Sequence, residues 1–151
     1  MFRKIVSGGQ TGVDRAALDF ALAHGIEHGG WCPKGRLAED GKLDERYRLN
    51  ETPRKEYNQR TEWNVRDSDG TLVIFSLELT GGTLYTCEVA RKQGKPVFTA
   101  ESGGFGKERE VFDWLVNNNI EVVNIAGPRS SSEPGIYAMT LEFLGNIYSC
   151  R

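Results

Sequence analysis

The chain has 151 residues, 38% of them hydrophobic and 26% charged, which predicts one globular domain over residues 1–151 with a core of its own. Its formal net charge of −2 argues against partners bound through broad positive charge, so we expect neither nucleic acid nor an anionic membrane surface as a partner. No apolar run is long enough to span a bilayer, and the first residues are unlike a signal peptide. The three cysteines form no C-x-x-C pair. We therefore expect a cytoplasmic protein with reduced thiols.

The first predicted elements are a short apolar strand at residues 4–7 and a helix at residues 13–24, with Gly25 as its C-cap. The glycine-rich stretch 7–15 joins them. Backbone N–H groups at such a strand-to-helix junction, at the positive end of the helix dipole, bind phosphate. A purely structural tight turn is the alternative, because the stretch matches neither the Walker A loop nor G-x-G-x-x-G. The predicted ligand contacts here are Gly8, Gly9, Gln10, Thr11, Gly12, Asp14 and Arg15.

A short second strand is predicted at residues 30–32, followed by a long loop excursion at about 33–60 with little regular structure. Lys34 and Arg36 begin this excursion and are candidates to neutralise a bound phosphate. Cys32 just before them is either a reactive thiol near two cations or a small buried hydrophobe, and the second interpretation is favoured.

The second half of the chain continues the alternation of helices and strands. We predict helices at 61–66 and 107–117, and a helix that follows the junction at 80–83 and runs to about residue 93. A last helix is predicted from about residue 134, and strands at 71–75, 96–99 and 121–126. Thr80-Gly81-Gly82-Thr83 is a second candidate phosphate cradle, in which the hydroxyls of Thr83 and Thr86 share a helix face. Capping of the helix by its threonines is the alternative there. Arg129, just after the last strand, is either a phosphate clamp or a structural residue.

Strands that alternate with helices predict an α/β fold with a doubly wound, mostly parallel sheet and helices on both faces. The polar junctions at 7–15, 32–36, 76–83, 101–106 and 127–130 then lie along one edge of the sheet and form a binding crevice. No protein-ligated metal is expected, because the H-x-x-E-H pattern at 24–28 is interrupted by Gly25.

Taken together, these stretches resemble the molybdenum-cofactor carrier protein family, a Rossmann-like group related to the cytokinin-activating phosphoribohydrolases. The resemblance covers most of the chain. It rests on S-G-G-Q-T-G-V-D-R-A-A-L-D at 7–19, C-P-K-G-R at 32–36, A-E-D-G at 38–41, D-S-D-G-T-L at 67–72, G-G-T at 81–83 with Thr86, and A-G-P-R at 126–129. It implies a three-layer α/β/α fold, a homo-oligomer (dimer or tetramer) and binding of the molybdenum cofactor or another phosphorylated nucleotide-like ligand.

The phosphoribohydrolase relatives carry the pattern P-G-G-x-G-T-x-x-E, whereas this chain has T-G-G-T-L-Y-T-C-E at 80–88. Two glycines and Glu88 keep their spacing, and the proline, the third glycine and the following threonine are replaced. The resemblance therefore favours a non-enzymatic carrier that holds a small phosphorylated heterocycle. The alternative is a nucleoside-monophosphate phosphoribohydrolase that uses Glu88 as acid/base, and a weaker third hypothesis is a partner-binding module.

Overall fold

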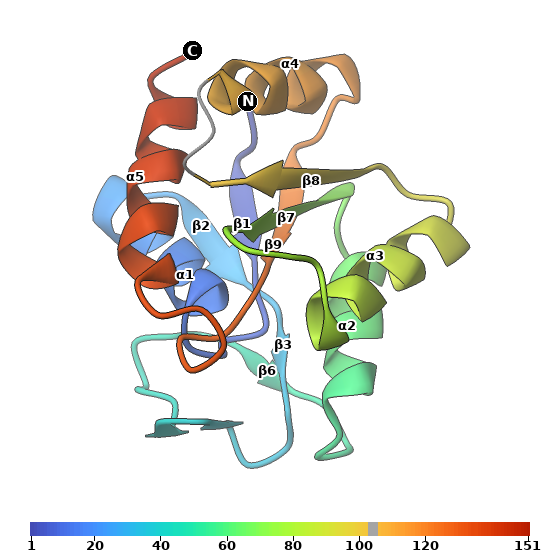
Figure 1. Ribbon diagram of the computed structural model, residues 1–151. Coiled ribbons are helices and arrows are strands. Elements are labelled where there is room, and N and C mark those ends of the chain that lie inside the picture. The colour runs from blue at the N-terminus through green and yellow to red at the C-terminus, as the bar shows by residue number, and fades with distance from the viewer. Residues whose placement is uncertain (103–105) are drawn as a thin grey trace.

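The computed structural model describes residues 1–102 and 106–151 (Figure 1); residues 103–105, within the predicted junction at 101–106, lie outside the described residues. A five-stranded sheet forms the centre, and each pair of neighbouring strands in it runs parallel. In spatial order its strands are β2 (Glu27–Gly29), β1 (Lys4–Val6), β9 (Val122–Ala126), β7 (Gly70–Phe75) and β8 (Val97–Glu101).

Helices cover both faces of this sheet (Figure 1). One face carries α1 (Val13–His24), α4 (Lys107–Asn117) and α5 (Ile136–Tyr148). The other carries α2 (Tyr57–Arg66) and α3 (Gly81–Lys92). The main core lies on the first face, where Phe20, Leu115 and Phe143 pack against the sheet, and a smaller cluster joins α2 and α3 through Val65 and Val89. The predicted three-layer α/β/α, Rossmann-like fold is therefore confirmed.

The strand order is a rearranged Rossmann order. If β9 and α5 are placed ahead of β1, the sheet has the order 3-2-1-4-5, which is the order of the Rossmann fold. The last strand of this chain thus takes the central place that the first strand has in that fold. Both ends of the chain lie at the top of Figure 1, as a permuted chain order requires.

The second strand of the sheet is not where the sequence predicted it. Residues 27–29 pair with β1, whereas β3 (Trp31–Cys32) pairs outside the sheet with β6 (Asn50–Glu51). Gly30 separates the two strands with φ +125°, and a Cβ there would lie 2.5 Å from the carbonyl oxygen of Ser7. The sequence did not predict this short edge strand, because its residues are polar or glycine and show no apolar pattern typical of a strand.

The excursion at 33–60 has more structure than predicted. It contains the hairpin of β4 (Leu37–Ala38) and β5 (Gly41–Lys42) together with β6, and its last residues already belong to α2, which begins at Tyr57 and not at residue 61. Leu43, Tyr47 and Leu49 are buried against α1, so a few apolar anchors order a mostly polar segment.

The remaining boundaries differ by small shifts. Helices α1 and α4 begin and end as predicted, and β8 extends to Glu101. Helix α5 begins at Ile136 because Gly135, with φ +87°, is its N-cap. Among the described helices, none has both the length and the apolar character that crossing a bilayer requires.

Candidate functional site

A cavity of about 400 Å³ opens at the carboxyl ends of β1, β7 and β9. Its walls come from the turns after these strands, from the start of α3 and from α2. Three of the five predicted junctions, at 7–15, 76–83 and 127–130, thus meet at one place. The junction at 32–36 does not line the cavity, because β3 is not part of the central sheet.

The position of the cavity follows from the strand order. Strand β9 continues into α5 on one face of the sheet, and its neighbour β7 continues into α3 on the other face. Connections that diverge in this way leave a crevice between the two strands, and ligands of open parallel sheets bind in such crevices. Asn124 and Ala126 of β9 form part of the wall at this point.

The first glycine turn, residues 7–12 after β1, uses most of its N–H groups internally. The N–H groups of Gly9, Gln10 and Thr11 donate to side-chain oxygens of Ser7, Asp14 and Gln10, over 3.4, 3.3 and 3.0 Å. The N–H of Val13 donates to the carbonyl of Pro128 over 3.2 Å. These donors are therefore engaged by the protein before any ligand arrives.

The glycines of the first glycine turn are also tightly enclosed. Gly12 has φ +77°, and a Cβ there would lie 2.3 Å from the carbonyl oxygen of Pro128. Gly9 has φ +80°, and a Cβ there would lie 2.7 Å from Leu43. Glycine is required at these positions because the backbone is left-handed and neighbouring groups come very close.

The second glycine turn, residues 80–83 at the start of α3, is open. Gly81 and Gly82 are exposed at the edge of the cavity, and a Cβ on either would meet nothing within 4 Å. Among the described residues, no acceptor is bonded to the N–H of Gly81 or Gly82, whereas the N–H of Thr83 donates to the carbonyl of Thr80 (3.1 Å). The Thr86 hydroxyl donates to the carbonyl of Gly82 (2.9 Å). This turn presents free donors at the positive end of a helix dipole.

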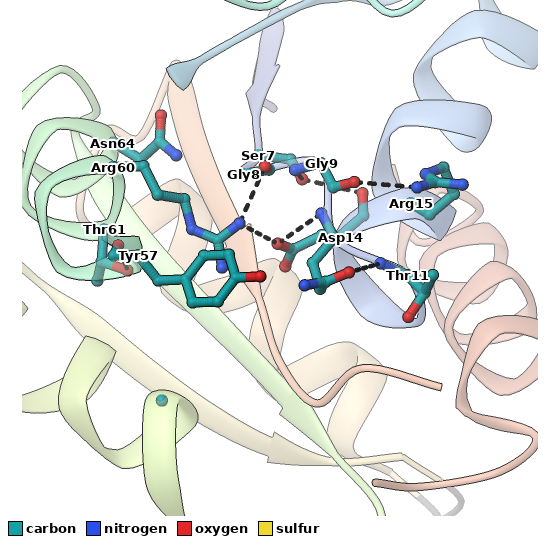
Figure 2. A network of polar contacts seen from close by, with 12 residues as sticks. Ser7, Gly8, Gly9, Thr11, Asp14, Arg15, Tyr57, Arg60, Thr61 and Asn64 are labelled. Carbon is teal, nitrogen blue, oxygen red and sulfur yellow. Dashed lines mark hydrogen bonds and ion pairs between the residues drawn. The ribbon is translucent and has the colours of Figure 1, made fainter. Parts of the chain in front are cut away.

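A buried carboxylate faces a buried guanidinium at the wall of the cavity (Figure 2). Asp14 Oδ2 lies 3.6 Å from Nη1 of Arg60, and the same nitrogen donates to the carbonyl of Gly8 over 3.0 Å. Only 7% of the Asp14 side chain and 15% of the Arg60 side chain are exposed. Burial raises the pKa of Asp14 to about 6, although Arg60 and the N–H of Gln10 both act to lower it.

Two of the predicted phosphate-binding cations are paired with acidic residues of the β4–β5 hairpin. The guanidinium of Arg15 donates to both carboxylate oxygens of Asp40, over 2.9 and 3.1 Å, and to the carbonyl of Gly9. Arg129 lines the cavity, and its Nε lies 3.7 Å from Oε2 of Glu39. Hydrogen bonds from Ser131 and Thr11 lower the pKa of Glu39 below its usual value.

The cations of the excursion lie elsewhere. Arg36 donates to the carbonyls of Asp44, Tyr47 and Leu49 and so holds the excursion together. Lys34 is exposed and is not among the residues that line the cavity.

The residues considered for catalysis and metal binding lie outside the cavity. Glu88 is exposed on α3 and is not among the lining residues, so the geometry does not favour the phosphoribohydrolase alternative. Cys32 and Cys87 are buried, and burial raises the pKa of both thiols, which agrees with the favoured interpretation of Cys32 as a small buried hydrophobe. Within the described residues, no group of three His, Cys, Asp or Glu side chains is placed to hold a metal ion.

Sequence reasoning missed the contribution of α2. Arg60 and the half-exposed Tyr57 line the cavity from this helix, and the Arg60 guanidinium lies 5.1 Å from the Tyr57 ring. Asn64 fixes α2 to β3 by exchanging hydrogen bonds with the backbone of Trp31. The tyrosine-to-arginine spacing of three residues was a usable signal, but it lay in a segment predicted to be irregular.

Comparison with known proteins gives two matches. The model of the family described as "Circularly permutated YpsA SLOG family" matches residues 5–148. A crystal structure from Syntrophus aciditrophicus SB, named a "Putative molybdenum carrier protein", is 47% identical, with a TM-score of 0.92 over 97% of this chain and 94% of that one. No curated protein matches significantly. The permuted strand order described above agrees with the description of the family.

Proposed function

This chain belongs to the circularly permutated YpsA SLOG family, and from that premise we propose that it binds a phosphorylated heterocycle in the cavity between β7 and β9. The proposed ligand is a nucleotide or a phosphorylated pterin such as the molybdenum cofactor, and the proposed role is that of a carrier. The name of the similar crystal structure, a molybdenum carrier, supports this choice of ligand.

The observation that carries the proposal is the open start of α3. Gly81 and Gly82 present their N–H groups at the edge of the cavity, where the helix dipole adds positive potential. Small exposed residues let a phosphate approach the backbone closely. The phosphate of the ligand is therefore proposed to lie against Gly81, Gly82 and the hydroxyl of Thr83, which also lines the cavity.

The rest of the cavity suits a heterocyclic ring. Its volume of about 400 Å³ lies within the range of small-ligand sites. Tyr57, Tyr85 and Leu77 contribute apolar surface to the lining, and Asp14 contributes a carboxylate. Tyrosine rings stack on flat heterocycles, and a carboxylate accepts hydrogen bonds from ring N–H groups.

The residues that line the cavity suit the organic part of a molybdenum-containing ligand and not its metal. The cavity offers N–H groups and hydroxyls for the phosphate, and aromatic surface for the ring. The soft donors Cys32 and Cys87 are buried away from it. Molybdenum is therefore proposed to be carried as part of the ligand and not to be held by a side chain of the described residues.

Calorimetry with matched ligands tests the proposal. AMP, GMP and a phosphorylated pterin are titrated into the protein, each beside its unphosphorylated form. We expect at least one phosphorylated compound to bind at least tenfold more tightly than its partner. Equal affinities for every pair would contradict the phosphate site, and release of free base during incubation would contradict the carrier role. Native mass spectrometry of the purified protein identifies any ligand that co-purifies.

Self-association stays a proposal as well. A dimer or tetramer was implied by the family resemblance. Light scattering after size-exclusion chromatography measures the molar mass, and a mass of 16.9 kDa at working concentration would reject self-association.

A further inference from the structure

We propose that Thr11, Arg129 and Ser131 form a second anion-binding site beside the cavity, which the carboxylate of Glu39 fills in the structure described here. The site is inferred to accept the second phosphate of a ligand that carries two, and Glu39 leaves as that phosphate arrives. This inference deepens the proposed function and rests on it for the heterocyclic part of the ligand.

The contacts of Glu39 resemble those of a bound phosphate. Its Oε1 accepts from the Thr11 hydroxyl and from the N–H of Ser131 (3.2 Å), and its Oε2 accepts from the Ser131 hydroxyl (2.6 Å). The guanidinium of Arg129 lies 3.7 Å away. Two hydroxyls, one backbone N–H and one guanidinium thus converge on one carboxylate. The same types of donor hold phosphate oxygens in proteins.

The place of this site in the fold supports a phosphate. Arg129 and Ser131 belong to the turn after β9, the strand that takes the central position of the Rossmann order. In that order the turn after the central strand is the one that holds a pyrophosphate. Arg129 and Gln10 also line the cavity, so the second site borders the proposed heterocycle site.

The hairpin segment that carries Glu39 is attached in a way that allows Glu39 to move out of the second site. Glu39 lies at the tip of the hairpin of β4 and β5, whose residues are largely exposed, and 51% of Leu37 is accessible to solvent. The tip is attached by polar contacts: Glu39 as described, Asp40 to Arg15, and the N–H of Glu39 to the Gln10 side chain (2.8 Å). A phosphate that replaces Glu39 therefore exposes little apolar surface.

The competing explanation is that Glu39 is a purely structural residue that holds the hairpin in place. Titration with inorganic pyrophosphate distinguishes the two explanations. The titration uses the wild type, Glu39→Ala, which empties the site, and Glu39→Gln, which keeps the shape and removes the charge. Glu45→Gln is the matched control, because Glu45 is an exposed glutamate of the same excursion. We expect Glu39→Ala to bind pyrophosphate at least tenfold more tightly than the wild type, Glu39→Gln to fall between them and Glu45→Gln to match the wild type.

The expected gain in pyrophosphate affinity of Glu39→Ala must also depend on Arg129. Adding Arg129→Ala to Glu39→Ala is expected to return the pyrophosphate affinity to within threefold of the wild type. Unchanged or weaker pyrophosphate binding by folded Glu39 variants would overturn the inference and leave a purely structural role for Glu39. If Glu39→Ala does not fold, the result for Glu39→Gln decides in the same way.

Nucleoside monophosphates distinguish this inference from the proposed function. Because the proposed phosphate contact at α3 does not involve Glu39, the affinity for a monophosphate is expected to stay within twofold in both Glu39 variants. If monophosphates bind but pyrophosphate shows no gain, only the second site is rejected. If pyrophosphate shows the gain but no phosphorylated heterocycle binds, the second site stands and the proposed function is rejected.

Discussion

The two glycine turns of this protein have similar sequences, but they differ in whether their N–H groups are already bonded and in how closely their glycines are packed. Both follow a strand of the central sheet and lead into a helix, and both contain a glycine pair. In the first glycine turn the N–H groups of residues 9–11 donate to side chains, and Gly12 lies against the backbone of Pro128. In the second, Gly81 and Gly82 have open space around them.

The difference shows that glycine serves two purposes at strand-to-helix junctions. In the first glycine turn it permits close packing of the backbone, and the turn positions Asp14 beside Arg60. In the second it leaves the start of a helix accessible to an anion.

Replacing the glycines by alanine is expected to give the largest contrast. Gly12→Ala places a methyl group 2.3 Å from a carbonyl oxygen at a position with φ +77°. We expect it to lower the free energy of unfolding by about 4 kcal/mol or more. Gly82→Ala meets no neighbour and adds helix propensity, so its effect is expected to stay within about 0.5 kcal/mol. Urea denaturation measures both, and equal effects would mean that the two turns do not differ in packing.

The pH dependence of stability probes the buried carboxylate of the first glycine turn. Folding raises the pKa of Asp14 from 3.8 to about 6, so the folded state binds the proton more tightly than the unfolded state does. The contribution of Asp14 to stability is therefore lost as the pH rises between these two values. The loss amounts to about 3 kcal/mol, because one pKa unit corresponds to about 1.4 kcal/mol.

Asp14→Asn removes this titration. We expect the stability of the wild type, measured relative to Asp14→Asn by urea denaturation at a series of pH values, to fall across that window and to stay level above it. The unpaired Arg60 of the variant lowers its stability at every pH and leaves the slope unchanged. Parallel stability curves would show that Asp14 has an ordinary pKa.

Removing one donor of the second glycine turn is expected to weaken ligand binding and leave the fold intact. Gly82 lies in the first turn of α3, where proline is tolerated and removes the N–H. We expect Gly82→Pro to weaken the binding of a phosphorylated heterocycle about tenfold, which corresponds to about 1.4 kcal/mol. Gly82→Ala keeps the N–H and is the matched control in calorimetry. Equal affinities for the two variants would argue against a phosphate at this position.

The smallest effect is expected for Lys34. It is exposed and outside the lining of the cavity, so Lys34→Ala is expected to change ligand affinity by less than twofold. Calorimetry with the same ligand measures the change. A tenfold loss would require that the start of the excursion folds over the cavity when the ligand binds.

Much of the fold was predictable because its signals are local. The apolar periodicity of α1 and the continuous apolar run of β7 fix those elements from neighbouring residues. The polar edge strand β2 and the start of α2 were missed because tertiary contacts, and not periodicity, stabilise them.

The candidate site was predictable only in part. The sequence places both glycine turns at one edge of the sheet, but the enclosure of the first depends on distant residues: the Pro128 carbonyl accepts from the N–H of Val13, and the Leu43 side chain packs against Gly9. Arg60 reaches Asp14 from a segment 46 positions later in the chain, and nothing in the sequence pairs these two residues.

Amide NMR during titration with a nucleoside monophosphate observes the two glycine turns separately, so it shows at which of them the phosphate binds. We expect the N–H signals of Gly81 and Gly82 to shift in a saturable way, while those of Gly9, Gln10 and Thr11, whose acceptors are already in place, move much less. Saturable shifts confined to the first glycine turn, or no saturable shift in either turn with any phosphorylated heterocycle, would contradict the proposal that the phosphate binds at the second glycine turn.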